Sequence, residues 1–290
     1  MRDEALAEVL ARLAAEGVDF ILLKGAALRL LRPEAAGRFQ CDVDLLLRRG
    51  DLERAEAVLD ALGFALDEEH RSRDAALETH FHLGYERNGA VVEIHWDVDR
   101  ASPPGFVEQL WARSAVVATP GETPGESTGR RRVLAPEHRL LFGCLHLSRH
   151  GFEAGLRWLA DLALELPLSG AQWERFEEDA WAWPWRAAHV PLWMLETLGA
   201  PNVSEAEALG RNGSLRLPER TLLRNLLVHL MMGEDWHGLP AWRAARAVRT
   251  WLFSQRPLLS VLAENSVSGL GGRSQPPGFP GSSRQRLPES

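Results

Sequence analysis

Two aspartates at i, i+2 spacing, Asp42 and Asp44, stand at the start of an apolar run, and their spacing suits cation binding. Val43 and residues 45–47 give this run the length and composition of a buried strand. On a strand, side chains two residues apart point the same way and lie about 7 Å apart, a span that one or two hard cations can bridge. Because burial of two like charges is unfavourable without a compensating cation, the pair predicts a site for Mg²⁺ or Mn²⁺.

The segment before these aspartates has the pattern of a phosphate site. Residues 20–23 predict a short apolar strand, Lys24 and Gly25 a tight turn, and residues 26–31 a helix. Backbone N–H groups at a helix start bind anions, and the lysine adds a point charge suited to phosphate. The chain has 33 basic residues, and Lys24 is the single lysine among them. We therefore interpret Lys24 as a functional residue rather than as a chance side chain that snorkels from a strand end.

A β-hairpin is predicted further along the chain. Two strand-like runs, residues 78–86 and 90–98, flank the dipeptide Asn88-Gly89. Both positions of this dipeptide favour positive φ, as the tight turn of a hairpin requires.

The second strand of this hairpin carries Glu93, His95 and Asp97 on one face. A polar face of this kind is by itself typical of the solvent side of a sheet, and we interpret Asp97 in that way. Next to a strand with two aspartates, however, Glu93 becomes a candidate third metal ligand. His95 becomes a candidate for contact with the substrate or for support of a metal ligand.

Taken together, these segments resemble the polymerase-β-like nucleotidyltransferase superfamily over residues 15–100. The resemblance rests on the motifs LLKGAAL, Gly37-Arg38, DVDLLL and VEIHW. They are most similar to a bacterial branch of uncharacterised nucleotidyltransferases.

The resemblance implies a division of roles among these residues. Lys24 and Gly25 would bind the nucleoside triphosphate, Asp42 and Asp44 would hold two metal ions, and Glu93 would complete the catalytic and metal-binding site. Better known members of the superfamily have Gly-Ser or Gly-Gly where this chain has Lys24-Gly25, which leaves the phosphate contacts open.

The implied reaction is metal-dependent transfer of a nucleoside monophosphate from a nucleoside triphosphate to an acceptor hydroxyl, with pyrophosphate leaving. Arg38 is a candidate phosphate contact or a cap of its loop. The acceptor stays open between a small molecule, a peptide and a protein, and ATP is one of several possible donors. A net charge of −7 makes nucleic acid a less favoured partner, because non-specific affinity for it comes from phosphate neutralisation.

Two other functions stay open. A non-catalytic nucleotide-binding or regulatory protein would retain the fold; the altered glycine turn favours it and the three acids disfavour it. A zinc or manganese hydrolase could use the histidine pairs, but it lacks a cysteine partner and a His-Glu-x-x-His motif. These pairs are His80 with His82 and His146 with His150.

The chain of 290 residues is expected to form an α+β protein with two domains. The expected segments are a nucleotidyltransferase domain with a small mixed sheet (1–118), a Pro- and Gly-rich linker (119–132), a helical domain (133–263) and a disordered tail (264–290).

Composition predicts a globular protein with a real core and no membrane span. Hydrophobic residues make up 45% of the chain, and no apolar run approaches the roughly 18 residues that a span needs. Two cysteines, Cys41 and Cys144, give no disulfide framework and predict a cytoplasmic location.

Overall fold

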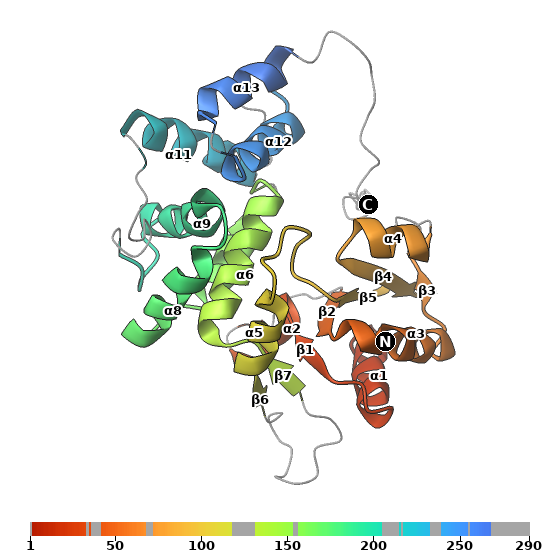
Figure 1. Ribbon diagram of the computed structural model, residues 1–290. Coiled ribbons are helices and arrows are strands. Elements are labelled where there is room, and N and C mark those ends of the chain that lie inside the picture. Colours follow the sequence, from red (N-terminus) through yellow and green to blue (C-terminus); the bar gives the residue numbers. More distant parts are fainter. Residues whose placement is uncertain are drawn as a thin grey trace, which may run out of the picture.

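The protein has a sheet-containing half and a helical half, with helix α6 (Pro136–Arg149) between them (Figure 1). The computed structural model describes residues 2–32, 35, 42–67, 72–117, 131–152, 156–204, 215, 217–232, 239–254 and 256–267. Within these ranges, none of the helices is both long enough and apolar enough to cross a membrane.

Seven strands of the described chain form one mixed sheet in the order β3-β4-β5-β2-β1-β7-β6. They are β1 (Phe20–Leu22), β2 (Asp42–Leu47), β3 (Ala65–Leu66), β4 (His82–Arg87), β5 (Ala90–His95), β6 (Ala115–Val117) and β7 (Arg131–Val133). The central strand β2 is antiparallel to β1 and parallel to β5. The predicted mixed sheet is therefore confirmed.

Four helices of the first half lie around this sheet, and those of the second half form a separate group beside it (Figure 1). The first group is α1 (Arg2–Ala15), α2 (Lys24–Leu31), α3 (Leu52–Ala61) and α4 (Arg73–Thr79), whereas α5 (Phe106–Arg113) packs Phe106 against rings of the second half. The second is α6, α7 (Leu156–Ala163), α8 (Gly170–Ala180), α9 (Trp185–Thr197), α11 (Leu217–Met232), α12 (Ala241–Leu252) and α13 (Leu258–Val267). The predicted α+β class with a helical second half is confirmed.

Strand β2 sends its side chains into two different hydrophobic cores. Val43, Leu45 and Leu47 are buried in a core that includes residues of α1 and α3. Leu46 points the other way, into a core that includes six residues of α6. Since side chains alternate along a strand, Asp42 and Asp44 share the face of Leu46, which is the face toward the helical half.

Helix α2 starts two residues earlier than predicted. The chain turns at Leu23 and Lys24, and Lys24 adopts φ +43°. Gly25, predicted to form the turn, is buried inside the first turn of the helix. A left-handed backbone costs a non-glycine residue about 1–2 kcal/mol. Lys24 thus occupies a backbone conformation that would favour glycine.

The hairpin turn is confirmed, but its strands are shorter than predicted. Asn88 and Gly89 have φ values of 52° and 75°. The first strand begins at His82 instead of residue 78, because the preceding segment forms helix α4. Ser72 caps this helix by accepting a hydrogen bond from the backbone N–H of Ala75.

The sheet includes residues from both sides of the expected linker. Residues 118–130 lie outside the described residues, whereas Arg131 and Arg132, expected as linker, belong to β7, which pairs in parallel with β1. Helix α13 continues to Val267, past the expected start of the tail, and residues 268–290 lie outside the described residues.

Candidate active site

The register of the sheet brings the predicted acids together. Asp44 on β2 lies directly opposite Glu93 on β5, and Leu46 lies opposite His95. Partners in a parallel pair present their side chains on the same face. The alternation of β2 and the register of β5 therefore place Asp42, Asp44, Glu93 and His95 on one face.

Lys24 reaches this acidic group from the start of α2. Its Nζ lies 2.5 Å from Oδ1 of Asp44 and 3.5 Å from Oε2 of Glu93. The side chain of Asp44 is 3% exposed, whereas those of Lys24 and Glu93 are 21% and 27% exposed. Solvent and ligands therefore reach the group from the side of Lys24 and Glu93.

His95 contacts the same two carboxylates. Its Nε2 lies 3.1 Å from Oδ1 of Asp44 and 3.2 Å from Oε2 of Glu93. Its ring is buried and stacks on the ring of His82, with 4.9 Å between the centroids. The same oxygen of each carboxylate thus contacts both an ammonium group and an imidazole.

The pKa values in this group follow from burial and from these contacts. Burial opposes the ammonium of Lys24, but Asp44 and Glu93 outweigh it and raise its pKa. Burial would raise the pKa of Glu93, but the charge of Lys24 and the hydrogen bond from His95 hold it well below its usual range. For His95, burial lowers the pKa, yet hydrogen bonds to the two carboxylates raise it overall. These contacts therefore favour an ionised Glu93 beside a charged Lys24.

The residues that could ligate a metal differ in one member from the predicted set. Within the described residues, Asp44, Glu93 and His95 each offer a ligand atom, and these atoms lie within 4.8 Å of one another. Asp42 is half-buried on the same face, and burial and the charge of Asp44 raise its pKa. Sequence reasoning named Asp42, Asp44 and Glu93 as ligands; the structure adds His95 to the tight group. The predicted phosphate contact Arg38 lies outside the described residues.

A ring cluster between α6 and α7 was not predicted from the sequence. The rings of His146, His150 and Trp158 form a cluster with centroid distances of 4.4 to 4.9 Å. Burial and the charge of Lys24 hold the pKa of His146 well below its usual range and lower that of His150 to about 4. Both imidazoles are therefore neutral at pH 7.

Contacts near the C-terminal end of α6 fix its position beside the site. Arg149 forms an ion pair with the buried Asp99, and its guanidinium carbon lies 5.8 Å from the centroid of Phe81. The ring of Phe81 in turn lies 5.9 Å from that of His95. These contacts join segments that are distant in sequence, so no local sequence pattern predicts them.

The zinc site considered from the histidines is not formed among the described residues. His80 and His82 belong to the start of the hairpin, and His146 and His150 belong to α6. The one group of candidate ligands found in the described chain contains two carboxylates and His95. The described residues therefore give no support to a zinc hydrolase built on these four histidines.

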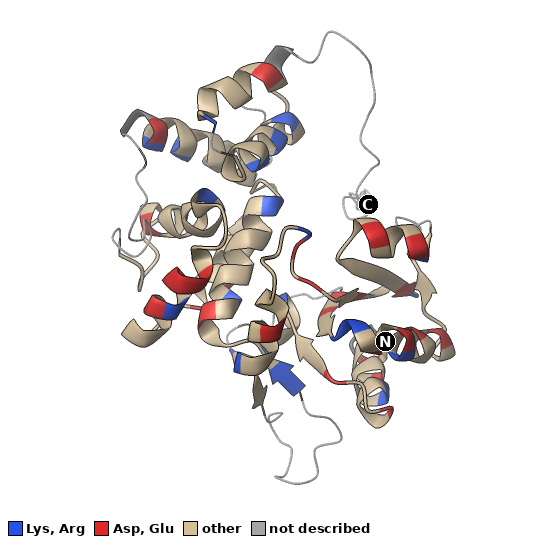
Figure 2. Cartoon of the chain, in the orientation of Figure 1, with Lys and Arg blue, Asp and Glu red and all other residues tan. Residues whose placement is uncertain are grey.

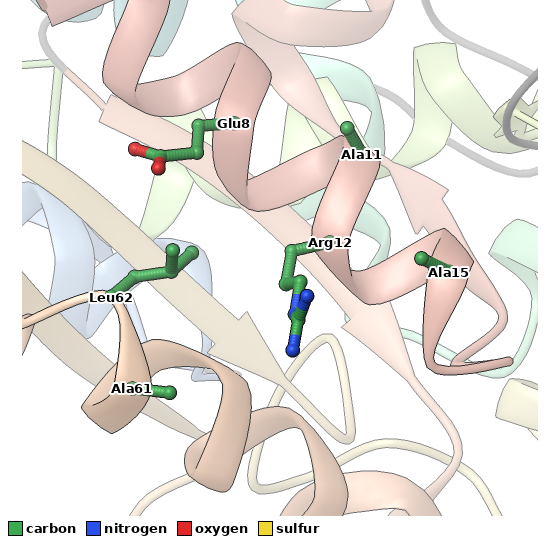
Figure 3. A pocket seen from close by; sticks show the side chains of 6 residues that line it. All are labelled: Glu8, Ala11, Arg12, Ala15, Ala61 and Leu62. Atoms are coloured by element: carbon green, nitrogen blue, oxygen red, sulfur yellow. The ribbon is translucent and has the colours of Figure 1, made fainter.

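A shallow groove of about 490 Å³ lies elsewhere, between α1 and the end of α3 (Figure 3). Its walls are formed by Glu8, Ala11, Arg12, Ala15, Ala61 and Leu62. None of these residues belongs to the acidic group. Figure 2 shows basic and acidic segments interspersed over the described helices of both halves, in keeping with the net charge of −7.

A mixed sheet that sets two aspartates beside a third acid, backed by a helical half, defines the class of protein that the sequence motifs predicted, a nucleotidyltransferase. The chain belongs to the uncharacterised nucleotidyltransferase family, whose family model matches residues 2–196. The protein is thus an enzyme that transfers nucleotidyl groups.

Two further comparisons add little to the site. No curated protein matches this chain. The solution structure of the antibiotic-resistance factor ANT(2'')-Ia is similar with 14% sequence identity and a TM-score of 0.37, over 69% of this chain and 95% of that chain. At this level of similarity no residue role is transferred from that structure.

Proposed function

We propose that the enzyme transfers a nucleoside monophosphate from a nucleoside triphosphate to a hydroxyl group of a small molecule, peptide or protein, in a reaction that depends on Mg²⁺ or Mn²⁺. The observation that carries this proposal is the pairing of Asp44 with Glu93 across two parallel strands, with Asp42 on the same face. This arrangement supports the predicted roles of the three acids.

The donor atoms of the site fit a divalent cation. Carboxylate oxygens are the preferred ligands of Mg²⁺ and Mn²⁺, and an imidazole nitrogen is also acceptable to Mn²⁺. Asp42, Asp44 and Glu93 would hold the cation, with His95 fixing the orientation of two of them. When bound, a cation in such a site neutralises phosphate charge and lowers the pKa of the attacking hydroxyl.

The chain's own residues would position the substrates. Lys24 and the first turn of α2, with Gly25, lie beside the acids, where the triphosphate is expected to enter. The charges of Lys24 and Glu93 act on His146 and His150, and a neutral imidazole can accept a hydrogen bond from a hydroxyl. We therefore expect these two rings to contact the acceptor.

The test is incubation of the purified protein with each α-labelled nucleoside triphosphate and Mg²⁺ or Mn²⁺, alone and with a small-molecule extract. A double variant, Asp42→Asn with Asp44→Asn, serves as the inactive form. Asp60→Asn, which changes an exposed acid on α3, is the matched control. We expect label transfer or pyrophosphate release by the wild type and the control, and its loss in the double variant.

Two results would contradict the proposal. One is a wild-type protein that neither binds nor consumes any nucleoside triphosphate with either metal; a non-catalytic protein with the same fold would then be favoured. The other is a double variant that retains full activity, because the acids would then have no part in the reaction.

A further inference from the structure

We propose that Lys24 takes the place of one of the two divalent ions expected in this catalytic centre, so that the enzyme works with a single divalent ion. This inference rests on the proposed function and refines it. The ammonium group would serve as the fixed cation between Asp44 and Glu93, and the divalent ion would bind on the side of Asp42.

The first argument is space. An ion that bridges Asp44 and Glu93 must lie about 2.0–2.6 Å from an oxygen of each. The Nζ of Lys24 already lies 2.5 Å from Oδ1 of Asp44 and 3.5 Å from Oε2 of Glu93. An ammonium group and a metal ion cannot occupy the same position, so the second ion would have to displace the lysine.

The second argument is the crowding around the two oxygens. Nε2 of His95 lies 3.1 Å from Oδ1 of Asp44 and 3.2 Å from Oε2 of Glu93. These are the same two oxygens that Nζ of Lys24 contacts. Both oxygens are therefore already engaged by two side chains, and an ion that bridges them would have to displace at least one of these contacts.

The third argument is the residue type and the backbone conformation at position 24. Of 33 basic residues, 32 are arginine, and the exception is the residue that contacts the acids. An ammonium is a compact point charge, whereas a guanidinium is a planar fork that needs more room. Lys24 also adopts φ +43° at the start of α2, an unfavourable backbone that aims its side chain at the acids.

The test counts ions with Mn²⁺ as the probe. The full-length protein is saturated with a non-hydrolysable nucleoside triphosphate analogue and Mn²⁺, and bound Mn²⁺ is measured by equilibrium dialysis and by electron paramagnetic resonance. Two ions about 4 Å apart give a coupled spectrum, whereas one ion gives the six-line spectrum of isolated Mn²⁺. We expect one Mn²⁺ per bound nucleotide and the six-line spectrum for the wild type.

Two variants sharpen this measurement. In Lys24→Met the position between Asp44 and Glu93 becomes free, and we expect two Mn²⁺ and the coupled spectrum. Arg29→Met removes a positive charge from the same helix and should behave as the wild type. Thermal unfolding in EDTA should show Lys24→Met to be less stable than the wild type, and Mn²⁺ should restore much of the difference.

The outcomes separate this inference from the proposed function. Two Mn²⁺ per nucleotide in the wild type would overturn the role of Lys24 and leave the proposed function intact. This measurement uses the wild-type protein alone and does not depend on whether a variant folds. A single ion in both the wild type and Lys24→Met would also overturn it. A wild type that binds neither Mn²⁺ nor the analogue would instead contradict the proposed function.

Discussion

The two faces of the sheet are built from the same strands but have opposite characters. One face, with Val43, Leu45 and Ile94, is apolar and is covered by α1 and α3. The other carries Asp44 and Glu93 toward the helical half. Neighbouring residues of β2, such as Asp44 and Leu45, therefore point to a charged site and to a hydrophobic core, respectively.

This contrast shows how one short strand supports both stability and chemistry. Burial of each leucine side chain stabilises the fold by about 1.5–3 kcal/mol, and the leucines fix the register of β2 against its neighbours. The register in turn sets Asp44 opposite Glu93. Changes on the apolar face should therefore alter stability, and changes on the charged face should alter activity.

The largest effect is expected from Glu93→Gln on the charged face. Loss of this charge should lower nucleotidyl transfer on the order of 10³-fold, near 4 kcal/mol, since the variant keeps the shape but not the charge of the acid. The free energy of unfolding should change by only about 1 kcal/mol, because the side chain is partly exposed. Activity assays and urea unfolding measure the two quantities.

Glu86→Gln, an exposed acid on β4, is the matched control and should change neither quantity. If Glu93→Gln unfolds the protein without a specific loss of transfer in the folded fraction, the division between the two faces is wrong.

Leu45→Ala on the apolar face should lower the free energy of unfolding by about 3 kcal/mol, because Leu45 is fully buried and the change leaves a cavity. The folded fraction should keep most of its activity. Urea unfolding checks the first value, and transfer measured well below the melting temperature checks the second. Leu156→Ala, at a position exposed to 52%, provides a control with almost no change in stability.

A smaller effect is expected on the helical side of the site. In the folded protein the pKa of His150 is about 4, whereas an unfolded histidine has a pKa near 6.5. As the pH falls from about 6.5 to 4, the unfolded chain takes up a proton that the folded chain does not, so stability falls by about 3 kcal/mol. The groups whose charges act on His150 include Lys24, Arg149, Glu93 and Arg249.

His150→Gln should remove this contribution and give a shallower fall in stability over the same pH range, measured by urea unfolding at several pH values. Equal slopes for the wild type and the variant would show that His150 is protonated in the folded state and does not face a positive Lys24.

Much of the sheet and its acids could be predicted because the signals are local. Alternation along β2 predicted that Asp42 and Asp44 share a face, and Asn88-Gly89 predicted the turn that returns Glu93 to the sheet. The helical pattern predicted most of the second half. Predictions of this kind need only neighbours in sequence.

The parts that could not be predicted depend on distance across the fold. The sequence predicted that Lys24 contacts phosphate. In the structure its ammonium group donates a hydrogen bond to Asp44, 20 residues away along the chain. The return of β7 to β1 joins segments more than 100 residues apart. Helix α4 was missed because a short helix with a serine cap has little periodicity.

The alternation along β1 and β2 also limits how family members can exchange parts. Ile21, Leu23 and Leu46 lie in the core of the helical half although they belong to or directly follow strands of the sheet. An exchange of the helical half between two members must therefore supply a surface that accepts these three side chains.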